Sequence, residues 1–520
     1  MEREERWLSP VKFPKPETFL SILQGMSLTH HVAAYRKVLE VCVMVRWAGG
    51  RAMLVGGSVR DFLAGKISKD FDVEVYGLEP ETIREIVSQV GKFKDAGRSF
   101  GVLKIFLEGG MDIDVSLPRV DSKNDKGGHN GFNVRVNPYM SIKEAARRRD
   151  FTMNSICADP LTGELYDPFG GVVDIWRRVL RVTDSRQFRD DPLRVLRAIQ
   201  FVARLKLEVD PCSILILQEM ALLVSELPVE RIGEEWRKLL LKPEKPSLGL
   251  RVGMELGIWK HIHPELPPLV ETEQEPEWHP EGDAWEHTVL TVDEAAGIVR
   301  REGLEGDKAM EIMLGAFCHD FGKPETTEFV DGRIRSRGHE KAGEKPTRSF
   351  LKSLGVNRRK LEDPIVGLVV NHLYPTILFI EERVKGKRVR DKSIRRLADR
   401  AHPATIRNLV LVSEADHRGR GNFSPEVVVQ MDMPIESFPV ALWLLERAQI
   451  LRVEMSRPES LTRGRDWMSF GFPQGSHIGE LIRLSNYLRD GNCFTLEDVL
   501  VPMEGVASPD EAVERLRNLL

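Results

Sequence analysis

The hydrophobic pattern divides the chain into a part with short strand-like runs and a longer part with helical periodicity. Apolar residues at helical spacing predict one helix over 30–47 and another over 81–90. Short apolar or alternating runs predict strands at 52–55, 102–107 and 112–116. We therefore expect a small mixed α/β domain in the first third of the chain.

From about Asp184 the strand-like runs give way to helical periodicity. Residues 190–205, DDPLRVLRAIQFVARL, begin a series of amphipathic segments that Pro and Gly turns interrupt almost to the C-terminus. Residues 119–140 are rich in Gly and Asn, which is typical of a loop. The pattern thus predicts a mixed α/β part followed by an all-helical part, and residues 1–28 form a lead-in.

Composition narrows the class of protein. The 520 residues suggest about three to four domains, and 42% hydrophobic with 30% charged residues is typical of a globular protein. The net charge of −4 gives no overall field that attracts nucleic acid, so a polyanionic partner must meet local basic patches. Residues 383–400, with nine basic and two acidic side chains, form one candidate patch, although most such runs are solvated helix faces.

The five cysteines are scattered and form no C-x-x-C pair, which favours a reducing compartment and argues against a zinc ribbon. The first ten residues, MEREERWLSP, carry no apolar core of a signal peptide. No apolar run approaches the roughly 18 residues of a membrane span. We expect a cytoplasmic protein without a membrane partner.

Residues 54–75, LVGGSVRDFLAGKISKDFDVEV, carry the first candidate chemistry. Gly56, Gly57 and Ser58 can bring backbone N–H groups and a hydroxyl close to a phosphate, with Arg60 in reach of the same anion. Asp70 and Asp72 are two residues apart on a predicted strand, so both carboxylates share a face, as in a metal site. A tight turn and a solvated acidic pair would explain each feature separately, but their combination is far more specific.

This stretch resembles the class II tRNA nucleotidyltransferases and the bacterial poly(A) polymerases. The resemblance continues through RRDFTMN at 148–154, DPFGGVVD at 167–174 and DDPLR at 190–194, over roughly residues 50–260. It implies a mixed α/β, polymerase-β-like nucleotidyltransferase head followed by all-α neck, HD and tail domains. The domain boundaries that we expect are 29–183 for the head, 184–268 for the nucleotide-reading neck, 269–420 for the HD domain and 421–520 for an RNA-binding tail.

Phosphoryl transfer of this kind needs two metal ions held by carboxylates. The resemblance implies that Asp70 and Asp72 hold Mg²⁺ and that Asp114 is a third catalytic carboxylate, although Asp112 shares its strand face and could serve instead. The residues that we expect to bind the nucleotide are Gly56, Gly57, Ser58, Arg60, Arg149, Asp150, Asn154, Asp191 and Arg194.

Asp191 and Arg194 are three residues apart on a predicted helix, and the resemblance makes them the pair that reads the base. Cytosine and adenine each present an exocyclic amine beside a ring-nitrogen acceptor, which an Asp acceptor and an Arg donor satisfy together. Uracil and guanine present the reverse pattern, which would leave like groups facing each other. An isolated D-x-x-R is usually a surface ion pair, so the interpretation depends on the motif series. Asp190 stands where the family usually has Glu.

A second constellation lies downstream and has the series H…HD…H…H…D of metal phosphohydrolases. Its core set is His287, His319, Asp320 and Asp416, and His339 and His372 would complete a second metal position. Imidazole with carboxylate favours a transition metal such as Ni²⁺, Mn²⁺ or Fe over Mg²⁺. Lys323 could contact a phosphate.

The segment EADHRGR around Asp416 resembles the EADARGR of bacterial CCA-adding enzymes that also hydrolyse 2′,3′-cyclic phosphates and 2′-phosphates. We therefore expect template-independent addition of CMP and AMP to tRNA 3′ ends from CTP and ATP, with a linked HD phosphohydrolase. Two alternatives remain. One is a poly(A) polymerase or a CC- or A-adding enzyme on the same scaffold, and the other is an RNA-binding HD phosphohydrolase with a vestigial nucleotidyltransferase site.

Overall fold

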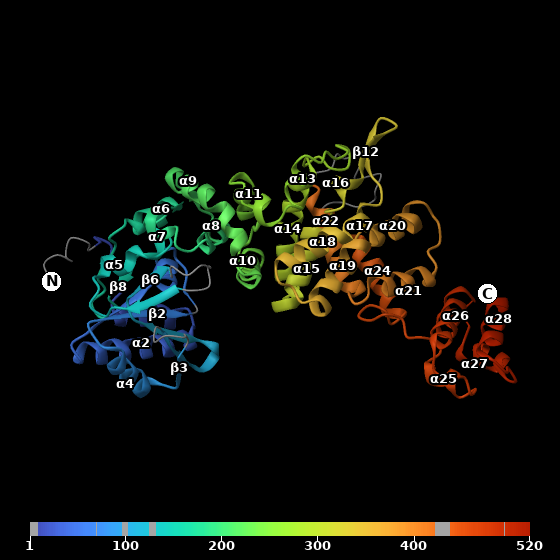
Figure 1. The fold of residues 1–520 in the computed structure, drawn as a ribbon, viewed down its shortest axis with the longest axis horizontal. Helices are drawn as coiled ribbons and strands as arrows, with labels where there is room; N and C mark the ends of the chain where they lie inside the picture. Colours follow the sequence, from blue (N-terminus) through green and yellow to red (C-terminus); the bar gives the residue numbers. More distant parts are fainter. Residues whose placement is uncertain are drawn as a thin grey trace. The chain divides into compact units, whose positions relative to one another are not determined.

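The computed structural model describes residues 9–68, 70–95, 102–123, 132–421, 437–492 and 494–519. The chain forms two compact units (Figure 1). Unit 1 comprises Met1–Leu239 and Leu248–Ile262, and unit 2 comprises Leu240–Ser247 and His263–Leu520. Each unit is described by itself.

A seven-stranded sheet organises the head of unit 1. Its strand order is β3-β4-β5-β2-β1-β8-β9, and β2 and β5 run parallel whereas the other neighbours are antiparallel. The strands predicted at 52–55, 102–107 and 112–116 are confirmed within one residue. The strands are β1 (Arg51–Val55), β2 (Phe71–Tyr76), β3 (Phe93–Asp95), β4 (Val102–Phe106), β5 (Asp112–Ser116), β8 (Cys157–Ala158) and β9 (Leu165–Tyr166).

Alternation along the strands gives the sheet two different faces. On β1, Ala52 and Leu54 enter a large core with helices α2 (Thr29–Trp47) and α4 (Pro80–Val90). Met53 and Val55 enter a smaller core with α5 (Ile142–Arg147). On β2 the same alternation directs Asp72 and Glu74 to the face of α5, so the acidic side chains lie opposite the large core.

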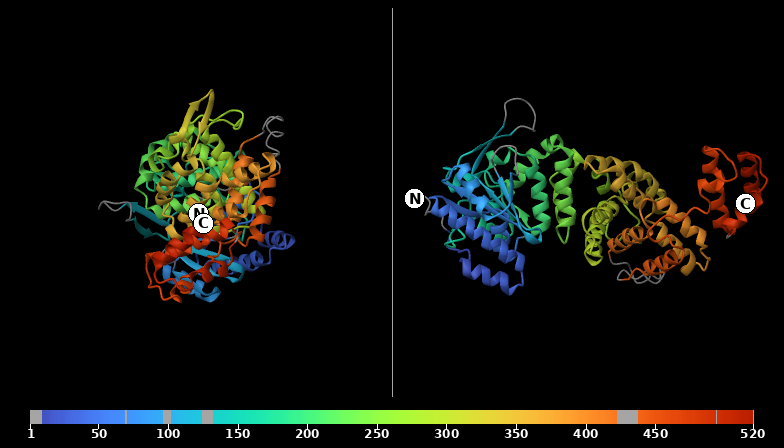
Figure 2. Two further views of the ribbon diagram at one scale, coloured as in Figure 1. Left: turned by 90° about the vertical axis from the view of Figure 1, so that its right-hand side faces the viewer. Right: turned by 90° about the horizontal axis from the view of Figure 1, so that it is seen from below.

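The lead-in carries structure that the sequence pattern did not predict. Helix α1 (Pro16–Gly25) begins with Pro16 at a position where its missing N–H costs no hydrogen bond. Phe19 and Leu23 of this helix are buried in the large core, and α1 runs beside α2 (Figure 2). The segment before residue 29 is therefore part of the head.

The Gly- and Asn-rich segment, residues 119–140, was expected to be a loop, but it contains two paired strands. Strands β6 (Arg119–Lys123) and β7 (Phe132–Val136) pair antiparallel, whereas residues 124–131 lie outside the described residues. The helices that follow the strands of this sheet are α6 (Gly171–Arg177), α7 (Ser185–Phe188), α8 (Leu193–Leu205), α9 (Pro211–Met220), α10 (Val229–Leu241), α11 (Ser247–Glu255) and α12 (Trp259–Ile262), with a short parallel pair β10 (Val179–Leu180) and β11 (Glu208–Val209).

Unit 2 is built from helices, as predicted, and α14 (Ala284–Arg301) packs against both α15 (Gly306–Cys318) and α22 (Ile406–Gly419). A two-stranded hairpin, β12 (Thr327–Val330) with β13 (Arg333–Ser336), is its one sheet among the described residues. The other helices are α13 (Pro267–Val270), α16 (Lys323–Thr326), α17 (His339–Ala342), α18 (Glu344–Ser353), α19 (Asp363–Asn371), α20 (Tyr374–Phe379), α21 (Asp391–Ala401) and α24 (Pro439–Ile450).

The C-terminal helices share a separate apolar core around the fully buried Trp467. They are α25 (Gly464–Met468), α26 (Ser476–Asn492), α27 (Leu496–Leu500) and α28 (Pro509–Leu519). One continuous helical stretch, Arg358–Val384, has the length and composition of a membrane span, but half of its apolar window is buried inside the protein. That burial is typical of a core helix, so this stretch is weak support for a membrane span.

Candidate active sites

A cavity of about 1050 Å³ in unit 1 contains most of the residues predicted to bind the nucleotide. It lies beside the turn at Gly56 and Gly57, the acidic face of β2 and the start of α8. Eight of its twenty lining residues are arginine and five are Asp or Glu, so the cavity suits a polyphosphate. The predicted residues that line it are Gly56, Gly57, Arg60, Asp72, Arg149, Asp150, Asn154, Asp191 and Arg194.

The carboxylates of the proposed metal site lie on neighbouring strands. Asp72 and Asp114 are direct partners in the parallel register of β2 and β5, so their side chains share a face. Burial, followed by the charge of Asp114, raises the pKa of Asp72 to about 6. Lys104 Nζ lies 3.2 Å from a carboxylate oxygen of both Asp112 and Asp114. Asp114, in register with Asp72, is therefore better placed than Asp112 to complete the cluster.

Asp70 differs from its predicted place. Strand β2 begins at Phe71, so Asp70 is an exposed residue just before the strand and not its first member. Its negative charge still contributes to the raised pKa of Asp72. Asp70 is therefore close to Asp72, although it does not line the cavity.

The Gly-Gly turn brings backbone close to the acidic cluster. Gly56 has φ +66°, a left-handed conformation that favours glycine, and a Cβ there would lie 3.4 Å from Asp72 Oδ2. The hydroxyl of Ser58 donates to the carbonyl oxygen of Val55 at 3.0 Å, and Ser58 is buried. Ser58 thus fixes the turn and, among the predicted nucleotide-binding residues, does not line the cavity.

A chain of buried polar side chains connects this turn with α8. The guanidinium of Arg60 is bonded to Asp61 and donates to Asn154 Oδ1 at 2.8 Å. Asn154 Nδ2 in turn donates to Asp150 Oδ1 at 2.8 Å, and Arg197 of α8 donates to Asp150 Oδ2 at 2.7 Å. These residues hold one another, so Arg60, Asp150 and Asn154 shape the cavity rather than standing as free phosphate ligands.

Arg149 is also committed to an internal contact. Its guanidinium donates to Glu74 Oε2 at 2.7 Å, and Arg148 donates to the other oxygen of Glu74 at 2.7 Å. Glu74 is 1% exposed; burial favours its neutral form, but Arg149 and Arg148 hold its pKa below the usual value. No sequence motif marks Glu74 or Arg197, because their roles depend on contacts with residues that are far away in the sequence.

Asp191 lies outside the helix that was predicted to carry it. Helix α8 begins at Leu193, because Pro192 disfavours the helical conformation at Asp191 before it, and Asp191 Oδ1 accepts the N–H of Leu193. Asp191 pairs with Arg231 of α10 at 3.0 Å, a partner that the sequence did not reveal. Arg194 donates to the carbonyl oxygens of Gln187 at 2.7 Å and Arg148 at 2.6 Å. Both predicted base-reading residues line the cavity, each with its own partners.

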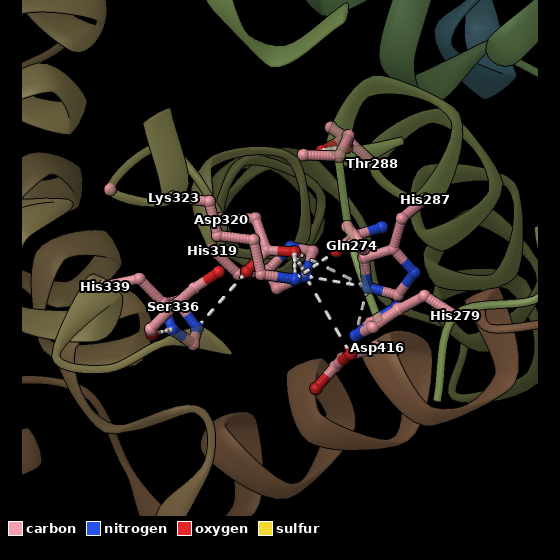
Figure 3. A network of polar contacts seen from close by, with 12 residues as sticks. Gln274, His279, His287, Thr288, His319, Asp320, Lys323, Ser336, His339 and Asp416 are labelled. Carbon is pink, nitrogen blue, oxygen red and sulfur yellow. Dashed lines mark hydrogen bonds and ion pairs between the residues drawn. The ribbon is translucent and has the colours of Figure 1, made fainter. Parts of the chain in front are cut away.

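The second candidate site is a buried cluster in unit 2 (Figure 3). Its side chains come from five helices or their ends, so the helical context that was predicted is present. Ligand atoms lie within a few ångströms of one another. The residues are His287 of α14, His319 and Asp320 after α15, His339 of α17, His372 after α19 and Asp416 of α22.

The cluster has two halves that share Asp320. His287 Nε2 lies 3.1 Å from both His319 Nε2 and Asp416 Oδ1. His319 Nε2 lies 3.1 Å from Asp320 Oδ2.

On the other side of the shared carboxylate, His339 Nε2 lies 3.3 Å from Asp320 Oδ1 and 3.3 Å from His372 Nε2. The geometry therefore offers two adjoining metal positions, with one oxygen of Asp320 facing each.

The outer nitrogens of the histidines fix their orientation. Nδ1 donates to a backbone carbonyl in His319 (to Ala316), His339 (to Ser336) and His372 (to Val369), at 2.6–2.7 Å. In neutral imidazoles, Nε2 is then an acceptor. Acceptor nitrogens that face one another and two carboxylates repel unless a cation lies between them, so the donor set fits divalent metal ions.

Two cations border the cluster. Lys323 Nζ lies 2.6 Å from Asp320 Oδ2 and donates to Gln274 at 2.5 Å, and Arg420 contacts both oxygens of Asp416 at 3.0–3.1 Å. Burial favours the neutral acids, but His319 and Lys323 hold the pKa of Asp320 well below its usual value, and Arg420 and His287 do the same for Asp416. Both carboxylates are therefore ionised and ready to bind metal.

The sequence motif missed Glu281 and His279. Glu281 Oε1 lies 2.7 Å from His287 Nδ1 and 2.8 Å from His279 Nδ1. His287 is thus backed by a carboxylate where His319, His339 and His372 use backbone carbonyls. No spacing rule marks Glu281, since it lies in the PEGD turn before α14.

Comparisons with known proteins agree with the nucleotidyltransferase part of this description. The family model "Poly A polymerase head domain" matches residues 52–181, and "Probable RNA and SrmB- binding site of polymerase A" matches residues 207–269. The multifunctional CCA protein of Xylella fastidiosa (strain M23) is 33% identical over 383 residues, covering 71% of this chain and 84% of the relative. That of Pasteurella multocida (strain Pm70) is 31% identical over 408 residues, covering 76% and 89%.

Solved structures show the same fold at lower identity. The CCA-adding enzyme of Bacillus stearothermophilus in complex with CTP aligns with a TM-score of 0.58 at 21% identity, covering 93% of this chain and 98% of that one. The Thermotoga maritima CCA-adding enzyme complexed with tRNA aligns with a TM-score of 0.52 at 18% identity, covering 98% and 99%. The chain therefore belongs to the class II CCA-adding enzymes, a family of tRNA nucleotidyltransferases.

Proposed function

We propose that the chain adds CMP and AMP from CTP and ATP to tRNA 3′ ends without a nucleic-acid template. The observation that carries this proposal is one cavity with an acidic wall at Asp72 and a donor–acceptor pair at Asp191 and Arg194. The family membership and the relatives named multifunctional CCA protein support it.

The residues divide the work between transfer and selection. Asp72 and Asp114, together with Asp70, would hold two Mg²⁺ ions; when bound, such ions activate the attacking 3′-hydroxyl and stabilise the leaving pyrophosphate. The arginines of the cavity attract the triphosphate. Asp191 would accept a hydrogen bond from the exocyclic amine of C or A, and Arg194 would donate one to the adjoining ring nitrogen.

We further propose that unit 2 is a metal-dependent phosphohydrolase acting on phosphate esters such as 2′,3′-cyclic phosphates. The convergence of four imidazoles and two carboxylates beside Lys323 and Arg420 supports this activity. A transition metal held there supplies a nucleophilic water. Lys323 and Arg420 border the same cavity and would bind the phosphate oxygens.

Transcripts that end before CCA, after C, after CC and after CCA test the first proposal, each given CTP, ATP, UTP or GTP singly. We expect C, C and A in order and no further extension after CCA. Repeated A after CCA would indicate a poly(A) polymerase. Addition of C without addition of A after CC would indicate a CC-adding enzyme, and addition of A after CC without any addition of C would indicate an A-adding enzyme.

Two substitutions separate the activities. Asp72→Asn should lower nucleotide addition by at least about 10³-fold, since a metal-binding charge is lost, and should keep hydrolysis of adenosine 2′,3′-cyclic phosphate. Asp320→Ala should abolish hydrolysis of adenosine 2′,3′-cyclic phosphate and keep nucleotide addition. Unchanged addition in Asp72→Asn would refute the two-metal assignment, and unchanged hydrolysis in Asp320→Ala would refute the phosphohydrolase site.

A further inference from the structure

The hairpin of β12 and β13 borders the histidine–aspartate cavity of unit 2. Its residues Ile334 and Ser336 line that cavity together with Trp278. The hairpin projects from the helices of its unit in two views (Figures 1 and 2). It is anchored at its root, where Thr327 Oγ1 contacts Ser336 Oγ at 2.7 Å and donates to the carbonyl oxygen of Lys323 at 2.8 Å.

The register of the hairpin places an exposed aromatic ring at the mouth of the cavity. Phe329 is the cross-strand partner of Ile334, so the two side chains lie on the same face with Cβ atoms about 5 Å apart. Phe329 is 73% exposed, so most of its ring is open to solvent. It therefore offers a flat apolar surface directly beside a residue that lines the cavity.

The neighbouring loop is tied to the same hairpin. The N–H of Ile334 donates to Glu275 at 3.0 Å, and Arg333 pairs with Glu277 at 3.1 Å. This loop carries Trp278 into the cavity wall. The mouth is thus held in place on both sides, so Phe329 is a preorganised surface and not a side chain on a free loop.

The size of the cavity limits how much of a substrate it can hold. Its volume of about 220 Å³ is below the roughly 300–1,000 Å³ of pockets that enclose a drug-sized ligand. Metal ions and one phosphate group would fill most of this space. The remainder of an esterified substrate then has to lie outside the cavity, and Phe329 offers a surface there beside the lining residue Ile334.

We propose that Phe329 stacks on the nucleobase next to the phosphate ester held in the cavity. This inference rests on the proposed phosphohydrolase activity and goes beyond it, because it assigns recognition of the base to the hairpin. The preferred substrate is then the end of a single-stranded RNA, and esters without a base are poorer substrates. Aromatic stacking is the usual means of binding single-stranded RNA without strong sequence preference.

The test compares an ester that has a base with one that has none. The full-length, Mn²⁺-loaded protein is assayed with adenosine 2′,3′-cyclic phosphate, with a trinucleotide ending in the same group, and with glycerol 1,2-cyclic phosphate. Phe329→Ala should lower kcat/KM for both base-bearing esters by about 5- to 150-fold, mainly through KM, since stacking on one base has that magnitude. The glycerol ester should be unaffected.

Further variants separate stacking from general apolar contact. Phe329→Trp should retain activity on base-bearing esters, whereas Phe329→Leu should resemble Phe329→Ala. Glu328→Ala is the matched control. Glu328 is exposed on the opposite face of the same strand, and its cross-strand partner is Arg335.

Each possible result supports or refutes the proposed stacking role of Phe329. An equal loss on the glycerol ester, full activity in Phe329→Leu, or no loss in Phe329→Ala would overturn the stacking role while leaving the phosphohydrolase intact. A loss with the mononucleotide but not with the trinucleotide would overturn the RNA end as substrate. Absence of hydrolysis of all three esters by the unaltered protein would refute the proposed phosphohydrolase itself, and this inference with it.

Discussion

At the scale of single residues, the carboxyl group of Asp72 shows how an acidic cluster prepares a metal site. Its partner in the sheet register is Asp114, and Asp70 adds a further negative charge. Burial and these charges raise its pKa to about 6, so a proton competes with a metal ion within the physiological range.

This competition predicts a pH dependence of Mg²⁺ binding. Above pH 6 the Asp72 carboxylate is free for the ion; below pH 6 each ion must displace a proton, and affinity should fall by up to about tenfold per pH unit. Calorimetric Mg²⁺ titrations of the nucleotide-free protein at pH 5.5, 6.5 and 7.5 measure this, with Asp72→Asn subtracted as background. An affinity that is constant over this range would contradict the prediction.

In unit 2, Glu281 should strengthen the metal position that His287 serves. A carboxylate that accepts from Nδ1 makes the imidazole a better ligand, and loss of such a partner typically costs 10- to 100-fold in metal affinity. Glu281→Gln should therefore weaken one of two Mn²⁺ binding events by about that factor and leave the other unchanged. Calorimetry of the metal-free protein in an Asp72→Asn background checks it.

The matched control is Glu273→Gln, an exposed glutamate in the same loop. Equal affinities in both variants would mean that Glu281 only fills space beside His287.

At the scale of elements, buried ion pairs fix how the strands and helices of the head meet. Glu74 on β2 holds Arg148 and Arg149, which follow α5, and Asp150 holds Arg197 of α8. These contacts place the RRD motif between the sheet and the helix that carries Arg194. Residues that resemble nucleotide ligands in the sequence thus also form the frame of the cavity.

Removing the charge of Glu74 should destabilise the head. Glu74→Gln leaves two arginines near the sheet without their anion, and breaking a buried pair in this way costs about 3 kcal/mol. Scanning calorimetry should show the transition of unit 1 about 6–12 °C lower. Glu85→Gln, an exposed glutamate of α4 that lies outside the cavity, is the control and should shift neither transition.

Periodicity and motifs predicted which helices and strands exist better than they predicted where those elements end or which distant residues they contact. The strands of the head and helix α4 follow local patterns of apolar residues, which the sequence reports directly. Asp191 was assigned to a helix because D-x-x-R has helical spacing, but Pro192 delays the start of α8. Arg231 and Glu281 were missed because a contact between distant segments leaves no local signature.

At the scale of the whole molecule, two sites with different donor sets occupy different units. Oxygen ligands at Asp72 and Asp114 suit Mg²⁺, whereas the imidazole-rich cluster suits Mn²⁺ or Ni²⁺. The chain should therefore need two kinds of metal for its two proposed activities.

Metal removal and replacement test this division. After chelation with EDTA, both activities should be lost. Mg²⁺ alone should restore nucleotide addition, and hydrolysis of the cyclic phosphate should return only with Mn²⁺ or Ni²⁺. Full recovery of hydrolysis with Mg²⁺ alone would contradict the assignment of a transition metal.

The partners of Asp191 and Arg194 have a consequence for how a base is chosen. Asp191 already accepts from Arg231, and Arg194 already donates to two carbonyl oxygens. A carboxylate offers about four acceptor sites and a guanidinium five donors, so these contacts orient the two side chains and an incoming base need not break them. Cytosine and adenine then present complementary groups to the proposed pair, whereas uracil and guanine present like groups, which costs free energy. The selecting groups are thus held in position before the nucleotide binds, and selection needs no rearrangement of either side chain.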